Sequence, residues 1–354
     1  LKGTSGNILQ LLNLYSRKTT SLQFGGLTTN TTFGYLEAAE KGGNWLSAVA
    51  VTLDGGKAWY ERYDAANDNT TNVVPMDFYG GAAGIGETLL KLSQASGNQA
   101  FLDLAKEVAT FFTASADTTT GYAWPEKYSD VGNDQKLSTR WSKGTPGVGT
   151  FFLNLYQQTG DSAYLDVAMG VGDFLISTGV ADSNGLKWYR YALVDTSGTY
   201  LGRWHGVAGI ASFFMDLAIV GNNYIYMDAA IDALTYLTAK ATISSGQYSW
   251  VNEASGTEYI SGWSRGGGGI GATYLRAYLL TANSAYLTPI NGILDWYVAN
   301  TTTVNAGWAW GDTNLNKRLA TGLGHGSAGV IMFATEVFQK IKHPAAYTLM
   351  NQAS

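Results

Sequence analysis

The sequence contains no cysteine in 354 residues. This excludes disulfide bonds, thiolate metal ligands and cysteine nucleophiles together. Charge is also scarce: 14% of the residues are charged and the net charge is -5, which argues against a nucleic-acid partner. No apolar run is long enough to span a membrane, so we expect no membrane insertion. What the chain has in abundance is glycine, with 44 residues.

Much of this glycine falls in one phrase, Gly-x-x-Gly followed by an apolar stretch, which recurs six times. The gaps between successive copies are 78, 63, 62, 60 and 60 residues. A period of this size is typical of supersecondary units that stack or form a ring. The first glycines of the six copies are Gly3, Gly81, Gly144, Gly206, Gly266 and Gly326.

Each repeat predicts a helix at the motif, a turn, a second helix and a loop that contains a tryptophan. The motif helices are apolar nearly all round and are expected to be the inner, buried ones. The glycines let backbones approach where these helices converge. We therefore predict an all-α fold, an (α/α)6 toroid of six helical hairpins in a single domain, 1–354. The hairpins are expected at 5–52 (with a possible interruption at Gly42-Gly43), 82–115, 145–178, 207–240, 267–299 and from 327 to the end.

The inner helices of such a toroid are parallel, so their amino ends and positive dipole ends share one face. The residue before each motif is expected at that face: Lys2, Gly80, Lys143, His205, Arg265 and His325. The loop tryptophans should reach it as well: Trp59, Trp124, Trp188, Trp250 and Trp310. Two residues beyond three of them are Glu61, Glu126 and Asp312. A funnel lined by indoles, carboxylates and cations is the default ligand site.

Three phrases resemble the lanthionine synthetase C-like (LanC-like) family: Trp204-His205-Gly206, Trp263-Ser264-Arg265-Gly266 and Gly324-His325-Gly326. The resemblance implies an α/α toroid and a proton-transfer role for His205. Members of the family cyclise peptides on zinc, but Ser264 and Gly324 stand where the zinc cysteines are expected. His325 is the only remaining member of the metal triad, and zinc requires three protein ligands. The family also tends to have seven hairpins rather than six, so the resemblance supports the fold and not the reaction.

More distantly, the chain resembles six-hairpin glycosidases, in which two carboxylates act on sugars held by aromatic rings. Glu126 and Asp312 are our candidate acid/base residues, with His205 as a further proton carrier. Lys143 should favour the ionised form of Glu126, and nearby indoles should raise the pKa of Asp312. Candidate ligand-binding residues are Glu61, Trp59, Trp124, Trp188, Trp250, Trp310, Arg265 and His325.

Each assignment has a plainer alternative. The tryptophans would wedge the loops between helices, the carboxylates would form ion pairs, and the histidines would be inert remnants of an ancestral site. Three functions remain open at this point. They are a carbohydrate-binding or carbohydrate-hydrolysing protein, a zinc-less peptide-binding protein, and a self-assembling structural protein that uses the toroid as a rigid unit. We favour the first, with no cofactor.

The cellular location is expected to be extracellular or at the cell surface, because the surface is rich in threonine and asparagine and poor in charge. Candidate N-glycosylation sequons begin at Asn30, Asn69 and Asn300. No signal peptide precedes Leu1, and the first motif begins two residues later. We therefore expect a processed chain or part of a longer one.

Overall fold

The computed structural model describes residues 3–16, 34–61, 63–64, 69–70, 72–129, 136–194, 198–305, 307–311 and 319–352. Within these ranges the chain forms twelve α-helices and several pairs of very short strands. The helices follow one another as six hairpins, so the predicted all-α class and hairpin number are confirmed. None of the helices found in these ranges has the length and apolar character needed to cross a bilayer. Lys2, Asn30 and Asp312 lie outside the described residues.

Each motif opens the first helix of a hairpin. These first helices are α1 (Gly3–Ser16), α3 (Ala82–Ser96), α5 (Thr145–Thr159), α7 (Val207–Val220), α9 (Gly267–Thr281) and α11 (Ser327–Ile341). The second helices are α2 (Tyr35–Ala48), α4 (Gln99–Ala114), α6 (Ser162–Thr178), α8 (Ile225–Ala239), α10 (Leu287–Ala299) and α12 (Pro344–Gln352). A short 3-10 helix, η2 (Ser284–Tyr286), precedes α10. Helix α2 continues through Gly42 and Gly43 without interruption.

The turn inside each hairpin has the chemistry that its sequence predicts. Gly97 ends α3 in the left-handed conformation with φ 70°, which glycine adopts without a steric penalty. The Asn98 side chain then accepts a hydrogen bond from the Ala100 backbone N–H at 3.0 Å and caps α4. Asp161 caps α6 in the same way, accepting from the Ala163 N–H at 3.1 Å. The interval between first and second helices is therefore set by local residues.

The chain forms two compact units. The first comprises residues 1–135 and 147–170, and the second comprises residues 136–146 and 171–354. Helices α5 and α6 contribute residues to both. The prediction of a single domain over 1–354 stays a prediction.

In the first unit, glycine and aromatic residues bring the helices close together. A Cβ added at Gly43 of α2 would overlap the Leu92 side chain and lie 2.7 Å from Cε1 of Phe101. The Trp124 ring stacks on Phe152 with the planes 12° apart and the centroids separated by 6.2 Å. The strands of this unit pair as β1 (Val51–Leu53) with β2 (Gly56–Ala58), β3 (Tyr63–Asp64) with β4 (Asn69–Thr70), and β5 (Val73–Pro75) with β6 (Lys127–Ser129).

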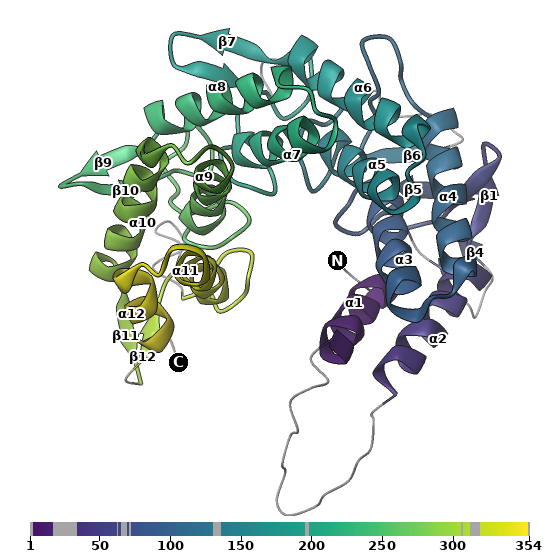
Figure 1. The fold of residues 1–354 in the computed structure, drawn as a ribbon, viewed down its shortest axis with the longest axis horizontal. Helices are drawn as coiled ribbons and strands as arrows, with labels where there is room; N and C mark the ends of the chain where they lie inside the picture. Colours follow the sequence, from purple (N-terminus) through teal and green to yellow (C-terminus); the bar gives the residue numbers. More distant parts are fainter. Residues whose placement is uncertain are drawn as a thin grey trace, which may run out of the picture. The chain divides into compact units, whose positions relative to one another are not determined.

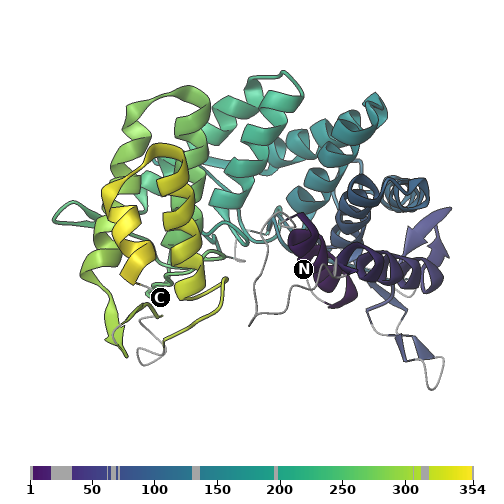
Figure 2. The same ribbon diagram turned by 60° about the horizontal axis from the view of Figure 1, so that its bottom comes forward.

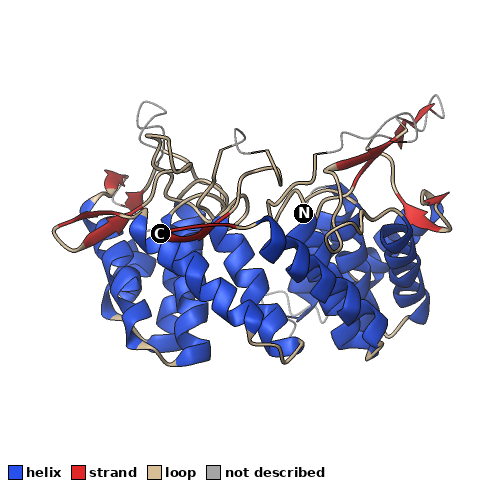
Figure 3. Cartoon of the chain, turned by 90° about the horizontal axis from the view of Figure 1, so that it is seen from above, coloured by secondary structure: helices blue, strands red, loops and turns tan. Residues whose placement is uncertain are grey.

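In the second unit, α8, α10 and α12 lie outside α7, α9 and α11 (Figure 1). Figure 2 shows α11 and α12 packed against each other at the carboxyl end of the chain. Three antiparallel hairpins follow second helices: β7 (Val180–Asp182) with β8 (Gly185–Lys187), β9 (Thr242–Ser244) with β10 (Gln247–Ser249), and β11 (Thr302–Val304) with β12 (Gly307–Ala309). The β9–β10 and β11–β12 hairpins lie at the same end of the helices as the loops before the motif helices (Figure 3).

The strand hairpins are a feature that the sequence interpretation missed, since it assigned these segments to loops. The β9–β10 turn is formed by Ser245 and Gly246, with φ values of 51° and 80°. Asp54 and Gly55 form the β1–β2 turn with φ values of 48° and 77°. Two consecutive positive φ values are characteristic of the tightest hairpin turn, and Asp-Gly is its usual sequence signal.

The inner helices α7 and α9 each contain one charged residue that is partly exposed. Asp216 of α7 forms an ion pair with Arg276 of α9, with 2.6 Å between the carboxylate oxygen and the guanidinium nitrogen. Both side chains are nearly half exposed. Each stands ten residues after the first glycine of its motif, so a polar position recurs within otherwise apolar helices. Most of α7 is buried, as its nearly continuous apolar sequence predicts, and Asp216 is its partly exposed charged position.

Candidate functional site

The motif glycines of the second unit are required by a tight turn in front of each helix. A Cβ added at Gly206 would overlap the carbonyl oxygen of Tyr200, six residues earlier. That carbonyl also accepts a hydrogen bond from the Val207 N–H at 3.0 Å. The same overlap occurs at Gly144, Gly266 and Gly326. The glycines thus allow a close approach of backbone to backbone, but the partner is the loop that enters the helix and not a neighbouring inner helix as predicted.

The loops in front of successive motif helices are joined by a ladder of backbone hydrogen bonds. The Ser142 N–H donates to the Trp204 carbonyl, the Trp204 N–H to the Ser264 carbonyl, and the Ser264 N–H to the Gly324 carbonyl, each at 2.8 Å. Each of these residues lies two positions before a motif glycine. The ladder therefore brings the next residues of the four loops to neighbouring positions: Lys143, His205, Arg265 and His325.

His205 is the titratable residue most strongly affected by this arrangement. Burial lowers the pKa of its imidazole to about 3, and the nearby positive groups act in the same direction. In order of effect these groups are Arg265, Arg140, His325 and Lys143. The Nδ1 atom lies 3.2 Å from Ser142 Oγ, which fixes the orientation of the ring. His205 is therefore an unprotonated imidazole among cations at neutral pH.

Arg265 occupies the position before the motif in the next repeat. Its Nε atom is buried and makes no hydrogen bond within the described part of the chain. Its backbone packs against Gly202, where an added Cβ would overlap the Arg265 Cα. The backbone of His325 packs against Gly262 in the same way, because a Cβ added at Gly262 would lie 2.4 Å from the His325 carbonyl carbon. The backbone thus positions both residues, and the predicted grouping of His205, Arg265 and His325 is found in the second unit.

Two half-buried indoles, Trp141 and Trp204, belong to these same loops. Trp263, three residues before Gly266, is buried beneath the Arg203 guanidinium, whose carbon lies 5.5 Å from the ring centroid. The sequence interpretation used Trp204 and Trp263 only for the family resemblance and did not propose Trp141 as a site residue. A tryptophan two or three residues before a motif glycine was the signal that could have identified them.

The five repeat tryptophans instead form the core. Their side chains are at most 6% exposed. Each indole N–H donates to a backbone carbonyl at the end of the preceding helix, as Trp250 does to Leu237 at 2.7 Å. The other donors and acceptors are Trp59 to Leu46, Trp124 to Phe112, Trp188 to Leu175 and Trp310 to Tyr297. The packing alternative fits this arrangement, and burial argues against direct stacking of a sugar on these rings.

Two of the predicted carboxylates belong to the first unit, and the third lies outside the described residues. Glu61, in the first unit, is exposed and forms an ion pair with Lys127 at 2.8 Å. Glu126 is half-buried in the same unit, and its backbone carbonyl accepts a hydrogen bond from the Met76 N–H at 3.0 Å. Asp312 falls in an undescribed segment. The proposed acid/base pair of Glu126 and Asp312 therefore stays a prediction.

The residues at the family's zinc position do not fit that metal. Ser264 is buried, and its hydroxyl donates to the Gly324 carbonyl at 2.8 Å, so it is already engaged. Gly324 offers no side chain, although a Cβ added there would lie 3.3 Å from Ser264 Oγ. Among the residues that the structure describes, no three His, Cys, Asp or Glu side chains gather as a metal site. One imidazole does not supply the ligands that zinc needs.

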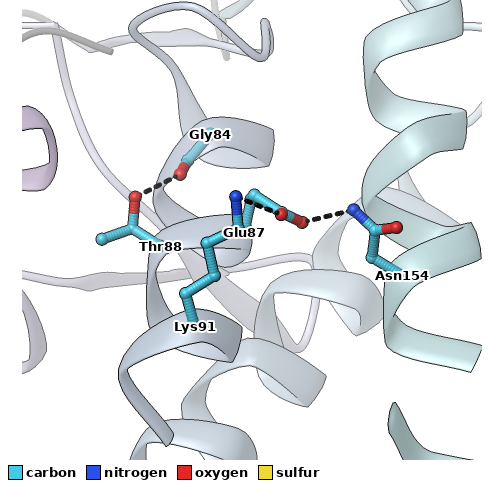
Figure 4. Close-up of polar contacts among 5 residues, drawn as sticks. All are labelled: Gly84, Glu87, Thr88, Lys91 and Asn154. Atoms are coloured by element: carbon cyan, nitrogen blue, oxygen red, sulfur yellow. Dashed lines mark hydrogen bonds and ion pairs between the residues drawn. The ribbon is translucent and has the colours of Figure 1, made fainter. Parts of the chain in front are cut away.

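The first unit contains a buried carboxyl that the sequence interpretation did not single out. Glu87 of α3 is 4% exposed; it accepts a hydrogen bond from Asn154 of α5 at 2.9 Å and lies 3.2 Å from the Lys91 ammonium (Figure 4). Burial raises the pKa of Glu87, whereas Lys91 and Asn154 act to lower it. Its position within an inner helix gives it partners for packing, so we assign it a structural role.

Comparison with solved structures identifies the fold. Cellobiose 2-epimerase from Bacillus thermoamylovorans superposes with a TM-score of 0.62 at 14% identity, covering 92% of this chain and 82% of the other. Nisin cyclase gives 0.60 at 15% identity over 98% and 84%. A family 76 α-mannanase from Bacteroides thetaiotaomicron gives 0.54 at 14% identity over 91% and 78%. These similarities confirm the α/α-toroid class.

The sequence comparisons are more specific. No curated protein matches the sequence. The family of lanthionine synthetase C-like proteins, however, matches residues 1–186 and 171–313. These matches include the repeats that carry His205 and Arg265. The resemblance read from the three Gly-containing phrases is thereby confirmed, and the chain belongs to the lanthionine synthetase C-like protein family.

Proposed function

We propose that this LanC-like protein binds a carbohydrate at the loops in front of α7, α9 and α11, and that His205 transfers a proton there. The observation that carries the proposal is the unprotonated His205 imidazole, held by Ser142 within a group of cations. Solved structures with the same fold include two that are named for carbohydrate chemistry, an epimerase and a mannanase. Their fold supports the proposal, and the assignment itself comes from the residues.

His205 can act as a proton acceptor because its surroundings keep the imidazole unprotonated across the physiological range. A pKa of about 3 also makes it a weak base, since proton transfer is most efficient when the pKa lies near the working pH. The contact of Nδ1 with Ser142 fixes one ring nitrogen, and Nε2 is the atom that we assign to the substrate. Trp141 and Trp204, half-buried in the same loops, supply aromatic surface for a sugar ring.

Hydrolysis is the form of this function that the sequence predicts, with Glu126 and Asp312 as base and acid. Glycoside hydrolysis requires two carboxyl groups on opposite sides of the scissile bond. Glu126→Gln and Asp312→Asn should then abolish turnover of an oligosaccharide while leaving its binding within a few-fold. If turnover survives in both variants, the reaction depends on other groups and the hydrolytic form is wrong.

The proposal is tested by titrating the purified protein with a panel of oligosaccharides and following both binding and turnover by NMR. We expect binding of at least one oligosaccharide, weakened by Trp204→Ala. The matched control is Trp45→Ala, because Trp45 is an exposed tryptophan of α2 outside these loops. An absence of carbohydrate binding across the panel would contradict the proposal.

A second candidate is peptide binding without modification. The observation in its favour is the family match, since nisin cyclase, a solved structure with the same fold, is named for a peptide substrate. The replaced metal ligands, Ser264 and Gly324, argue that such a peptide would not be cyclised on zinc. Binding of unmodified peptides in the absence of any carbohydrate binding would favour this candidate.

We also propose an extracellular or cell-surface location. Asn300 is exposed at the end of α10, where its side-chain amide donates to the Trp296 carbonyl at 2.9 Å. The sequon Asn300-Thr301-Thr302 is therefore on the surface. The side chains of Asn30 and Asn69 are not among those described. A mass shift on glycosidase treatment of protein from its native source, lost in Asn300→Gln, tests modification at this position.

A further inference from the structure

The charge around His205 is opposite in sign to that of the protein. The chain has a net charge of -5, yet three positive side chains act on His205, namely Arg140, Lys143 and Arg265, and His325 acts on its pKa in the same direction. We call these four residues, together with the unprotonated His205, the cationic cluster. Like charges that are close enough to act on one ring repel one another, and an anion placed among them relieves that repulsion. A neutral ligand does not.

The backbone keeps these residues from spreading apart. The ladder of 2.8 Å hydrogen bonds through Ser142, Trp204, Ser264 and Gly324 fixes the residue before each Lys143, His205, Arg265 and His325. Gly202 and Gly262 fix two of them from the other side, since an added Cβ would overlap the backbone of Arg265 and His325 respectively. The repulsion is therefore built into the loops and is not removed by a change in backbone position.

Arg265 is the member of the cluster best placed to take an anion. It forms no ion pair within the described part of the chain, and its buried Nε makes no hydrogen bond there. A guanidinium presents several N–H donors in one plane, which matches the two oxygens of a carboxylate. Leaving such a group without a partner costs free energy, and a carboxylate ligand would supply that partner.

The N-terminal ends of α7, α9 and α11 add to the positive electrostatic potential at the cationic cluster. The N-terminal positions of α7, α9 and α11 are glycines without a side-chain cap, and the first turns contain no acidic residue. The positive dipole ends of these three helices are therefore not offset by a carboxylate from their own sequence. They support an anion at the cluster, although the cluster itself is the main reason for expecting one.

We propose that the ligand of this site is an acidic carbohydrate, a uronate-containing oligosaccharide whose carboxylate pairs with Arg265 within the cationic cluster. This inference rests on the proposed carbohydrate function and names its substrate class. The sugar ring adjoining the carboxylate would lie against Trp141 or Trp204, the half-buried indoles of the same loops. His205 would then face a ring position close to the carboxylate.

The test compares oligosaccharides that differ only in the carboxylate. Oligomers of galacturonate, mannuronate and glucuronate are titrated by calorimetry against the neutral oligomers of galactose, mannose and glucose with the same linkages and lengths. We expect at least one uronate oligomer to bind about tenfold or more tightly than its neutral partner, because one good charge-assisted pair contributes that much. The affinity for the uronate should fall as salt is added.

Arg265→Gln should weaken binding of the uronate about tenfold or more and leave a bound neutral oligomer within a few-fold. Arg265→Lys keeps the charge but not the planar fork, so we expect an intermediate loss. Lys57→Gln removes a half-buried cation of β2 outside the cluster and is the matched control. Thermal unfolding of each variant shows whether it is folded; if Arg265→Gln is not, Arg265→Lys alone decides.

Each other outcome is informative. Equal binding of neutral and acidic oligomers would overturn this inference and leave the proposed function standing. Binding of uronate that neither Arg265 variant weakens would place the anion elsewhere and also overturn it. If no carbohydrate of either kind binds, the proposed function fails as well. Binding of acetylated tri-glutamate that depends on Arg265, without uronate binding, would assign the cationic cluster to an acidic peptide.

Discussion

Glu87 in the first unit and His205 in the second are both ionisable side chains that burial drives towards the neutral form. Their neighbours act in opposite ways. Around Glu87, the Lys91 ammonium and the Asn154 amide favour the charged form and oppose the effect of burial. Around His205, every charged neighbour that acts on the ring adds to the effect of burial. Neighbours offset the effect of burial on the pKa at the first site and reinforce it at the second.

On the function proposed above, this difference separates a structural site from a functional one. A buried group that acts only in packing is stabilised by partners, as Glu87 is by hydrogen bonds between α3 and α5. A group that must take up a proton or sit beside an anion can have surroundings that lower the stability of the folded protein. His205 has such surroundings, and the backbone ladder that holds Trp204 between Ser142 and Ser264 keeps them in place.

The largest expected effect separates the two residues by function. His205→Gln should reduce turnover by about 10²–10⁴-fold, the usual contribution of a proton-transfer group, and leave ligand affinity within a few-fold. Glu87→Gln should leave turnover unchanged, because Glu87 lies within an inner helix of the first unit. Rates measured on the substrate identified by the oligosaccharide panel decide this. Equal turnover in the parent protein and in His205→Gln would contradict the assignment of proton transfer to His205.

The next largest effect is expected in how the free energy of unfolding depends on pH. The pKa of His205 is about 3 in the folded protein and near 6.5 when exposed. Between these values the unfolded chain binds a proton that the folded chain does not, so the free energy of unfolding falls as the pH falls from 6.5 towards 3. The contribution is at most about 1.4 kcal/mol per pH unit in that window. Urea unfolding at several pH values should show a shallower acid dependence for His205→Asn.

A smaller effect of opposite sign is expected for Glu87. Its raised pKa means that the folded chain holds the proton more readily than the unfolded chain does. The free energy of unfolding therefore falls as the pH rises above about 4.5. Glu87→Gln keeps an acceptor for Asn154 and removes this dependence. Because Lys91 and Asn154 offset the effect of burial, Glu87→Gln should change the free energy of unfolding only slightly. Relative to the parent protein, we expect the variant to gain about 1 kcal/mol or less at pH 8 compared with pH 4. A loss at pH 8 would show that the ion pair outweighs burial.

The smallest expected effect is that of chelation. Purified protein should contain no stoichiometric zinc, and EDTA should leave its melting temperature unchanged, because Ser264 and Gly324 supply no thiolate. Metal analysis and thermal unfolding with and without EDTA check this. One tightly held equivalent of zinc would mean that the site uses ligands other than those named here.

The fold could be predicted from the sequence because its signals are local. The glycines recur at nearly fixed intervals, and the helix turns carry their own caps, as Asn98 does. The position of His205 beside Arg265 followed from the same repeat. The role of Trp250 and its equivalents did not, because a fixed interval does not distinguish a ring that binds a ligand from one that packs beneath a hairpin. The pair formed by Glu87 and Asn154 depends on contacts between repeats, which periodicity does not reveal.

The space beside Gly324 shows how little separates this chain from a metal-binding protein. A Cβ on Gly324 would lie 3.3 Å from Ser264 Oγ, so a side chain fits after a shift of a few tenths of an ångström. The hydrogen bond from the Ser264 N–H to the Gly324 carbonyl holds the two backbones together whichever side chains they carry. For protein engineering, Ser264→Cys with Gly324→Cys would place two thiols side by side next to His325 on an unchanged scaffold. At these two positions the backbone contact is already present, and only the side chains differ from thiol ligands.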